Sequence, residues 1–447
     1  MRQRGTTLLR RLHVGRLLVL CAAGAISAAG PAAFRVVYNL QGYDQPAGII
    51  EGSPGVFYSI AGSGPSIAFS VTSQGRQTVL GTIPKGNLFQ SLLVSGPNGR
   101  FYTSVYSGTP NATNNVFSVS SAPNSARTYP TTSVVPELTQ GLPGGRLLAG
   151  ALDLSPGAAG WGVATADMEG SVTMITTFPS SDQTENVIYG SDGNFYGVVE
   201  PANSSTTGYV FRLSPSGSLT KLYNFPANTF TGYMPTPLLQ ADDGNLYGAT
   251  VTGGANGTGM IYKLTLGGQF TLLHSFGKGQ IPQGPASLIE ASDGNLYGVS
   301  QANSGAGQIF RLTKSGGYAV LYEMSEANGL PPCWLLQGSD GVIYGVAHAG
   351  GQTGAGTVFA LDVGLKPPKP TAQHFQPESG AVGTEVLIWG YNLLSPSVSF
   401  NGAATTKVFN SGSNYILATV PAGASTGPIT ITTPGGTHTT RASFTVQ

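Results

Sequence analysis

Asp-Gly-Asn sequences recur along the chain, and their side-chain oxygens are the first candidates for chemistry. The copy at residues 242–245 offers the oxygens of Asp242, Asp243 and Asn245, which could ligate a metal ion. A calcium loop, however, needs several carboxylates and carbonyls that converge from alternating positions, and each of these turns supplies only one or two. The same sequence is typical of a tight β-hairpin turn. We therefore interpret these segments as structural turns and expect no metal site.

The sequence contains no motif of a known catalytic chemistry. It has no serine nucleophile elbow, no HExxH zinc motif, no phosphate-binding loop and no pair of carboxylates at a diagnostic spacing. A glycosidase or a lyase could still carry its carboxylates on separate repeats, for example Asp153 with Glu200. We assign no catalytic residue and expect no cofactor, and this alternative stays open.

One position of the repeats varies as a ligand-binding surface would. It lies four residues after a recurring tyrosine, at the predicted end of a second strand, on the face from which the crossing segments emerge. An unconstrained surface would vary as much. Two aromatic residues in the crossing segments could form platforms for sugar rings or peptides, although packing at the rim explains them as well. The candidate binding residues are Tyr106, Glu200, Gln301 and His348 at the variable position, and Tyr233 and Trp334 in the crossing segments.

These residues belong to a repeated unit. SDGNLYG at residues 292–298 has near-copies along the chain, and the turn glycines are 44 to 51 residues apart. The most regular unit predicts strands at about 286–291, 295–301, 307–313 and 318–323. A period in the forties with several short strands per unit indicates the blades of a β-propeller. The seven units are defined by Gly55, Gly99, Gly145, Gly193, Gly244, Gly294 and Gly341.

A tyrosine usually follows the turn glycine by three residues, as Tyr297 follows Gly294. Because both faces of a blade are buried, we expect this ring to pack between blades. The next residue is always small, which would let neighbouring sheets approach. The third unit is the weakest match, because PGGRLLAG at 143–150 replaces the motif. If this unit is not a blade, the blades number six.

The seventh unit ends at about Asp362 without an outer strand. The outer strand of other units is exemplified by KLYNF at 221–225, and RVVYNL at residues 35–40 matches it. We expect residues 35–40 to pair beside 356–362, which would close the ring and remove an exposed sheet edge. The predicted propeller spans residues 30–363.

The two ends of the chain differ from the repeats. Residues 1–29 combine arginines, an apolar run and small residues, the pattern of a cleaved secretory signal peptide, and an uncleaved anchor over 17–33 is the alternative. Residues 364–370, GLKPPKP, predict a stiff linker. Residues 371–447 alternate short strands with turns and predict a small β-sandwich. Without the signal peptide Cys333 is the one cysteine, so no intrachain disulfide is expected.

Charged residues make up only 9% of the chain. The net charge is +1, and five arginines before residue 17 belong to the predicted signal peptide. Since acidic groups outnumber basic ones in the remainder, no basic surface for nucleic acid is expected.

Units four to seven closely resemble the GloVer tandem repeat of secreted bacterial proteins, through segments such as DGNLYG at 243–248 and IFRL at 309–312. The first three units resemble it less closely. Residues 371–447 resemble an IPT/TIG domain, which has an immunoglobulin-like fold, although Trp389 replaces the usual small or hydroxyl residue. The resemblance implies export and an extracellular or envelope location, and it implies no catalytic residue. Relatives often end in an anchor; this chain ends on a predicted strand, so no membrane anchor is expected in the mature chain.

We predict an all-β, exported protein, a seven-bladed β-propeller closed by an N-terminal strand and followed by a small immunoglobulin-like β-sandwich. The favoured function is non-enzymatic binding outside the cell, by a monomer, with a glycan or a surface protein as the ligand. One alternative is a carbohydrate-active hydrolase or lyase with catalytic groups around the central channel. Another is a purely structural surface protein whose ring displays the terminal domain.

Overall fold

The protein is all-β, as predicted. The computed structural model describes residues 32–42, 45–62, 66–83, 92–105, 115–131, 134–153, 160–178, 182–201, 208–226, 237–277, 280–282, 288–302 and 307–447. Apart from one 3-10 turn, η1 (Pro143–Gly145), every regular element in these ranges is a β-strand. None of the described segments is a helix with the length and apolar character needed to cross a bilayer.

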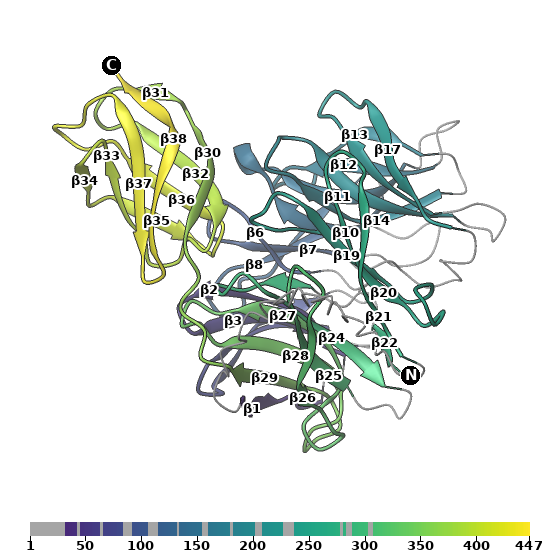
Figure 1. Ribbon diagram of the computed structural model, residues 1–447. Helices are drawn as coiled ribbons and strands as arrows, with labels where there is room; N and C mark the ends of the chain where they lie inside the picture. Colours follow the sequence, from purple (N-terminus) through teal and green to yellow (C-terminus); the bar gives the residue numbers. More distant parts are fainter. Residues whose placement is uncertain are drawn as a thin grey trace, which may run out of the picture.

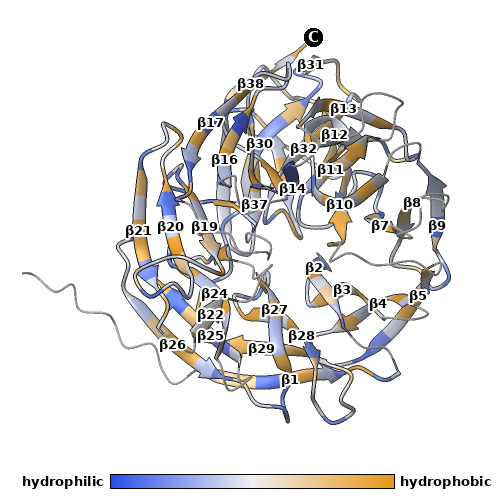
Figure 2. Ribbon diagram, turned by 90° about the vertical axis from the view of Figure 1, so that its right-hand side faces the viewer, coloured by the Kyte–Doolittle hydropathy of each residue, from blue (hydrophilic) through white to orange (hydrophobic). Residues whose placement is uncertain are grey.

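Strands within residues 33–362 form seven antiparallel sheets arranged around a common centre (Figure 2). We call this arrangement the ring and number its sheets in chain order. Sheets 1 to 3 consist of β2 (Ala47–Ser53), β3 (Val56–Ala61), β4 (Ser66–Thr72) and β5 (Gln77–Ile83); β6 (Val94–Ser95), β7 (Phe101–Val105), β8 (Asn115–Val119) and β9 (Arg127–Pro130); and β10 (Val134–Gly141), β11 (Leu147–Asp153), β12 (Gly160–Ala166) and β13 (Val172–Thr177).

Sheets 4 to 6 repeat the same meander. They consist of β14 (Asp182–Tyr189), β15 (Phe195–Pro201), β16 (Tyr209–Leu213) and β17 (Leu219–Asn224); β18 (Leu239–Gln240), β19 (Leu246–Thr250), β20 (Met260–Leu264) and β21 (Phe270–Ser275); and β22 (Gln280–Pro282), β23 (Ile289–Glu290), β24 (Leu296–Ala302), β25 (Gly307–Leu312) and β26 (Tyr318–Glu323). The strand predicted at 286–291 is therefore shorter than expected and is represented by β23. The weakest repeat does form a sheet, sheet 3.

Sheet 7 joins the two ends of the ring. It contains β27 (Leu330–Gln337), β28 (Ile343–Ala349), β29 (Thr357–Asp362) and β1 (Ala33–Asn39). The N-terminal strand β1 pairs antiparallel with β29, with Phe34 opposite Leu361. The predicted pairing of residues 35–40 beside 356–362 is thus confirmed. The Phe34 ring also stacks on Tyr322 of sheet 6, with the ring centroids 4.0 Å apart.

The hydrophobic core of the ring lies between adjacent sheets. Tyr297 of sheet 6 is buried with Ile343 and Phe359 of sheet 7, so the predicted packing of the motif tyrosine between sheets is confirmed. The small residue after the tyrosine has a different role from the one expected. A Cβ atom at Gly298 would lie 2.4 Å from the ring of Phe310, its cross-strand partner in the same sheet. The glycine therefore makes room for an aromatic ring on the adjacent strand.

Residues 371–447 fold into a second part, which we call the C-terminal unit. Its two sheets share one core that includes Ile388, Ile416 and Phe444, and Figure 1 shows it beside the ring. One sheet contains β30 (Thr371–Gln376), β32 (Glu385–Tyr391), β36 (Tyr415–Thr419) and β35 (Val408–Ser411), and the other contains β31 (Ser379–Gly380), β38 (Gly436–Val446), β37 (Gly427–Thr433), β33 (Ser397–Phe400) and β34 (Ala403–Thr405).

Deleting residues 34–40 should test the closing strand. The deletion would expose the edge of β29 and remove the stacking of Phe34 on Tyr322, so we expect aggregation or a fall in Tm of more than about 5 °C. Differential scanning calorimetry and light scattering, with the parent chain as reference, measure both effects. A melting curve close to that of the parent would show that β1 does not stabilise the ring.

Candidate functional site

Side chains near the ends of four innermost strands bind the backbone of an adjacent sheet. In each case a glutamine or glutamate oxygen accepts a hydrogen bond from a turn N–H, which satisfies a donor that the strand ladder leaves free. We call these contacts the inter-sheet bonds. They join Gln240 to Ser191 N (2.7 Å), Glu290 to Asp242 N (2.7 Å), Gln337 to Ser292 N (2.9 Å) and Glu51 to Ser339 N (2.7 Å).

The turn aspartates also have partners. Asp243 Oδ1 accepts a hydrogen bond from Asn245 N at 3.1 Å, and its Oδ2 accepts one from the Tyr247 hydroxyl at 2.8 Å. Burial acts to raise the pKa of Asp243, but the hydrogen bonds from Asn245 and Tyr247 together hold this pKa below its usual value. The sequence interpretation of a structural turn agrees with these contacts. It missed the bond from the tyrosine hydroxyl.

One junction between sheets carries charges. Lys314, in the turn after β25, forms ion pairs with Glu290 at 2.5 Å and with Asp242. The hydrogen bond from Lys314 lowers the pKa of Asp242, whereas burial raises the pKa of Glu290. Two carboxylates with opposite pKa shifts are a pattern that hydrolases use. Here Lys314 binds both of them and Glu290 also accepts the Asp242 N–H, so we interpret the cluster as a bridge between sheets 5 and 6.

The C-terminal unit is fixed to one side of the ring, over sheets 2 to 4. We call the contacts that hold it there the docking interface. They include the hydrogen bonds from Gln140 Nε2 to the Tyr391 hydroxyl (2.6 Å), from the Tyr415 hydroxyl to Leu142 O (2.9 Å) and from Gly99 N to Ser411 Oγ (2.9 Å). On the other side, Ser292 Oγ and Gln337 Nε2 donate to the linker carbonyl Lys366 O at 2.6 and 3.0 Å.

Residues that depart from the repeat pattern of the ring, and one that is unusual in the C-terminal unit, meet at the docking interface. Trp389, the unusual residue of the C-terminal unit, is 1% exposed. Its ring meets that of Tyr189 edge-on, with the centroids 5.7 Å apart. In the third repeat, a Cβ atom at Gly141 would lie 2.5 Å from the Tyr415 hydroxyl. The irregular residues of the two parts therefore serve to join them.

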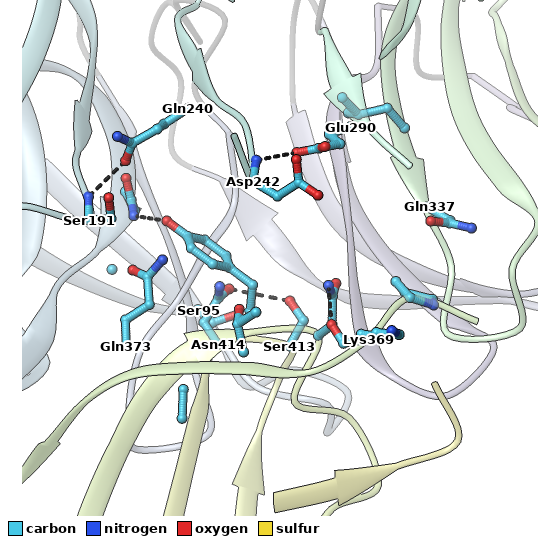
Figure 3. Close-up of a pocket in the computed structure, with 18 of the residues that line it drawn as sticks. Ser95, Ser191, Gln240, Asp242, Glu290, Gln337, Lys369, Gln373, Ser413 and Asn414 are labelled. Carbon is cyan, nitrogen blue, oxygen red and sulfur yellow. Dashed lines mark hydrogen bonds between the residues drawn. The ribbon is translucent and has the colours of Figure 1, made fainter. Parts of the chain in front are cut away.

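A cavity of about 1240 Å³ lies between the ring and the C-terminal unit (Figure 3). The ring side is formed by the residues of the inter-sheet bonds, because the turns and the ends of the innermost strands meet there. The opposite side belongs to the linker and the C-terminal unit. Among the residues that line it are Gln240, Asp242, Glu290 and Gln337 on the ring side, and Lys369, Gln373 and Asn414 on the opposite side.

The predicted binding residues within the described part of the chain lie elsewhere. Glu200 in β15, Gln301 in β24 and His348 in β28 are near the strand ends opposite to the turns, each in a different sheet. Burial raises the pKa of Glu200 and lowers the pKa of His348. Trp334 is 6% exposed and packs in the core between sheets 7 and 1.

Two of the predicted residues, Tyr106 and Tyr233, lie outside the described residues. The ring residues that line the cavity were missed although the sequence carried a signal for them. Gln240, Glu290 and Gln337 each precede the turn glycine by four residues. No comparable signal marks the residues of the C-terminal unit.

Within the described ranges, no group of three or more histidine, cysteine or acidic side chains could hold a metal ion.

The Gloeobacter/Verrucomicrobia repeat matches residues 183–406, just over half of the 447 residues. The chain belongs to this repeat family. The match covers sheets 4 to 6, strands β27 to β29 of sheet 7, the linker and part of the C-terminal unit, while β1 and the less regular sheets 1 to 3 precede it. No curated protein matches the chain.

Three of the solved structures that are similar to this chain are propeller enzymes. A streptogramin B lyase is 17% identical with a TM-score of 0.54, covering 75% of this chain and 99% of its own. A catalytically inactive virginiamycin B lyase from Staphylococcus aureus with quinupristin is 16% identical with a TM-score of 0.54, covering 74% and 99%. A puromycin hydrolase is 14% identical with a TM-score of 0.50, covering 77% and 58%. At these identities the similarity shows a β-propeller fold, and it does not indicate which activity the chain has.

Replacing Tyr247 by Phe should test the turn network of the repeat family. The substitution keeps the buried ring and removes the donor to Asp243, so we expect a loss of about 1–2 kcal/mol in the free energy of unfolding at pH 7. The folded-state pKa of Asp243 is depressed. Its contribution is therefore present above its unfolded pKa, about 3.9, and is lost as the pH falls through the folded value.

Urea unfolding of parent and variant at pH 7 and at about pH 3 measures this difference, which should shrink in acid. Tyr262→Phe is a matched control in the same sheet, because the buried Tyr262 hydroxyl has no hydrogen-bond partner among the described residues. Equal effects of the two substitutions, or a difference independent of pH, would contradict the assigned network.

A double substitution, Tyr391→Phe with Tyr415→Phe, should test the docking interface. It removes two hydroxyls that bond the ring and keeps both aromatic rings, so we expect docking to weaken by about 2 kcal/mol. Small-angle scattering should show a larger radius of gyration, and fluorescence should shift to the red as Trp389 gains access to water. Unchanged scattering and fluorescence would mean that other contacts hold the C-terminal unit.

Proposed function

We propose that the protein is an exported, non-enzymatic binding protein that holds a glycan in the cavity between the ring and the C-terminal unit. In this proposal each of the seven sheets is a propeller blade, β1 closes the last blade, and residues 371–447 form an immunoglobulin-like domain of the IPT/TIG kind. The pattern of residues 1–29 supports export. The observation that carries the proposal is the cavity itself, a large space lined by both apolar and polar groups, with walls from the ring and from the C-terminal unit.

The size and the chemistry of the cavity favour an oligosaccharide. Its volume of about 1240 Å³ exceeds the range of about 300–1,000 Å³ that is typical of small-molecule sites. Amide and hydroxyl groups, which donate and accept hydrogen bonds as sugar hydroxyls require, dominate its polar lining. Tyr189 and Tyr391 add aromatic surface. The cavity thus resembles the aromatic, polar groove that a glycan-binding protein needs.

The ring side of the cavity is fixed before a ligand binds. Gln240 and Gln337 are each held at both ends of the amide, since the oxygen accepts from the adjacent sheet and the nitrogen donates to the carbonyl of its own turn. Side chains that are already ordered lose little entropy on binding. This preorganisation would lower the entropic cost of binding a ligand at this wall.

A hydrolase or lyase remains the second candidate, because Asp242 and Glu290 are adjacent at the wall of the cavity. The ion pairs of both with Lys314 favour a structural role. A direct test is mass spectrometry of any bound glycan after prolonged incubation. We expect it to be recovered intact; cleavage that is abolished by Asp242→Asn would establish the enzymatic alternative.

A glycan array probed with residues 30–447 tests the proposal. We expect selective binding, and we expect Gln373→Ala to weaken it about tenfold, because Gln373 is exposed on the cavity wall (Figure 3). Gln269→Ala is the matched control, since Gln269 is exposed in a turn of sheet 5 away from the cavity. Binding that is unaffected by Gln373→Ala would move the site elsewhere, and the absence of binding would contradict the glycan proposal.

A further inference from the structure

The charged groups around the cavity differ between its two walls. On the ring side, every carboxylate that lines the cavity already has a partner within the described residues. Glu51 accepts hydrogen bonds from Gly55 N, from Ser339 N and from the Ser339 hydroxyl, at 2.7, 2.7 and 2.8 Å. Asp242 and Glu290 share the ammonium group of Lys314. This wall therefore keeps a net negative charge, three carboxylates against one ammonium, so a carboxylate of a ligand would have to face the opposite wall.

The opposite wall carries two cations without a charged partner. Lys369 and Arg441 are exposed and line the cavity. The ion pairs formed among the described residues are those of Lys314, so neither cation is paired within this part of the chain. Glu378 is the one carboxylate on the same wall, and His374 and His438 are the remaining titratable groups. Unpaired charge on this wall is thus positive in excess, two groups against one.

We propose that the cavity takes an acidic oligosaccharide whose carboxylates face Lys369 and Arg441. This inference rests on the proposed glycan-binding function and specifies the ligand class. Only 9% of the residues in the chain are charged, so two unpaired cations on one cavity wall are a notable concentration. A cleft with protein on both sides screens charges less than open solvent does, which strengthens attraction for an anion. Arg441 can bind a carboxylate through two parallel N–H groups.

The wall positions suit recognition of a chain with separated charges. Lys369 precedes β30, whereas Arg441 lies on β38, and His438 Nε2 contacts Ala372 O at 3.1 Å, which places these two strands side by side. The amides of Gln373 and of the ring wall lie in the same cavity. Uncharged hydroxyls of the ligand would meet these amides while its carboxylates meet the cations. A uronic acid oligosaccharide has both kinds of group.

Isothermal titration of residues 30–447 with oligogalacturonate and with a neutral cello-oligosaccharide of equal length tests this inference. We expect oligogalacturonate to bind at least about tenfold more tightly, and Lys369→Gln and Arg441→Gln each to weaken its binding about tenfold. Added salt should weaken the acidic ligand selectively. Lys407→Gln is the matched control, because Lys407 is exposed on the C-terminal unit and does not line the cavity.

The outcomes separate the two proposals. Equal affinity for both oligosaccharides, unaffected by the lysine and arginine substitutions but reduced by Gln373→Ala, would overturn the acidic specificity and leave glycan binding intact. Binding of neither oligosaccharide, together with a silent glycan array, would contradict the proposed function and this inference with it. Selective loss in the two cavity variants, with Lys407→Gln unchanged, would support both.

Discussion

The candidate site depends on the hydrogen bond that a turn N–H of one sheet donates to a side chain on the innermost strand of the adjacent sheet. Packing of apolar side chains between sheets is non-directional and could tolerate small rotations. The hydrogen bond that Ser191 N donates to Gln240 Oε1 is directional, and its counterparts fix the neighbouring sheets at the mouth of the ring. The same amides and carboxylates line the cavity. In the proposed function, the side chains that stabilise the ring would therefore also contact the ligand.

The fold could be predicted from the sequence because its signals are local and repeated. Each Asp-Gly turn predicts a hairpin. Gly294 has a φ of 75°, a conformation that glycine adopts without strain. The match between residues 35–40 and the outer strands of other units predicted the pairing of β1 with β29. The role of Gly298 was wrong in detail, since periodicity shows that a position is small without showing which ring occupies the space.

The candidate site could be predicted only in part. Gln240, Glu290 and Gln337 share a place in the repeat, so a search for polar residues at constant spacing could have found the ring wall. The docking interface joins residues such as Gln140 and Tyr391, 251 positions apart in the sequence. No repeat relates these two residues, and one sequence holds no information on such a pairing. Variation among repeats drew attention to the opposite face, where Glu200 and His348 lie in separate sheets.

The irregularities of the chain carry the information that its regularity lacks. A ring built from identical units would offer the C-terminal unit several equivalent docking positions. One docking position differs from the others because its residues depart from the repeat. Gly141 and Leu142 belong to the third repeat, whose motif is replaced, and they contact Tyr415. Tyr189 stands in the fourth repeat where other units usually have glutamine or glutamate, and it contacts Trp389. Because the C-terminal unit docks over sheets 2 to 4, the charged cluster of Asp242 and Glu290 between sheets 5 and 6 stays open to the cavity. Departure from the repeat therefore decides where the site is formed.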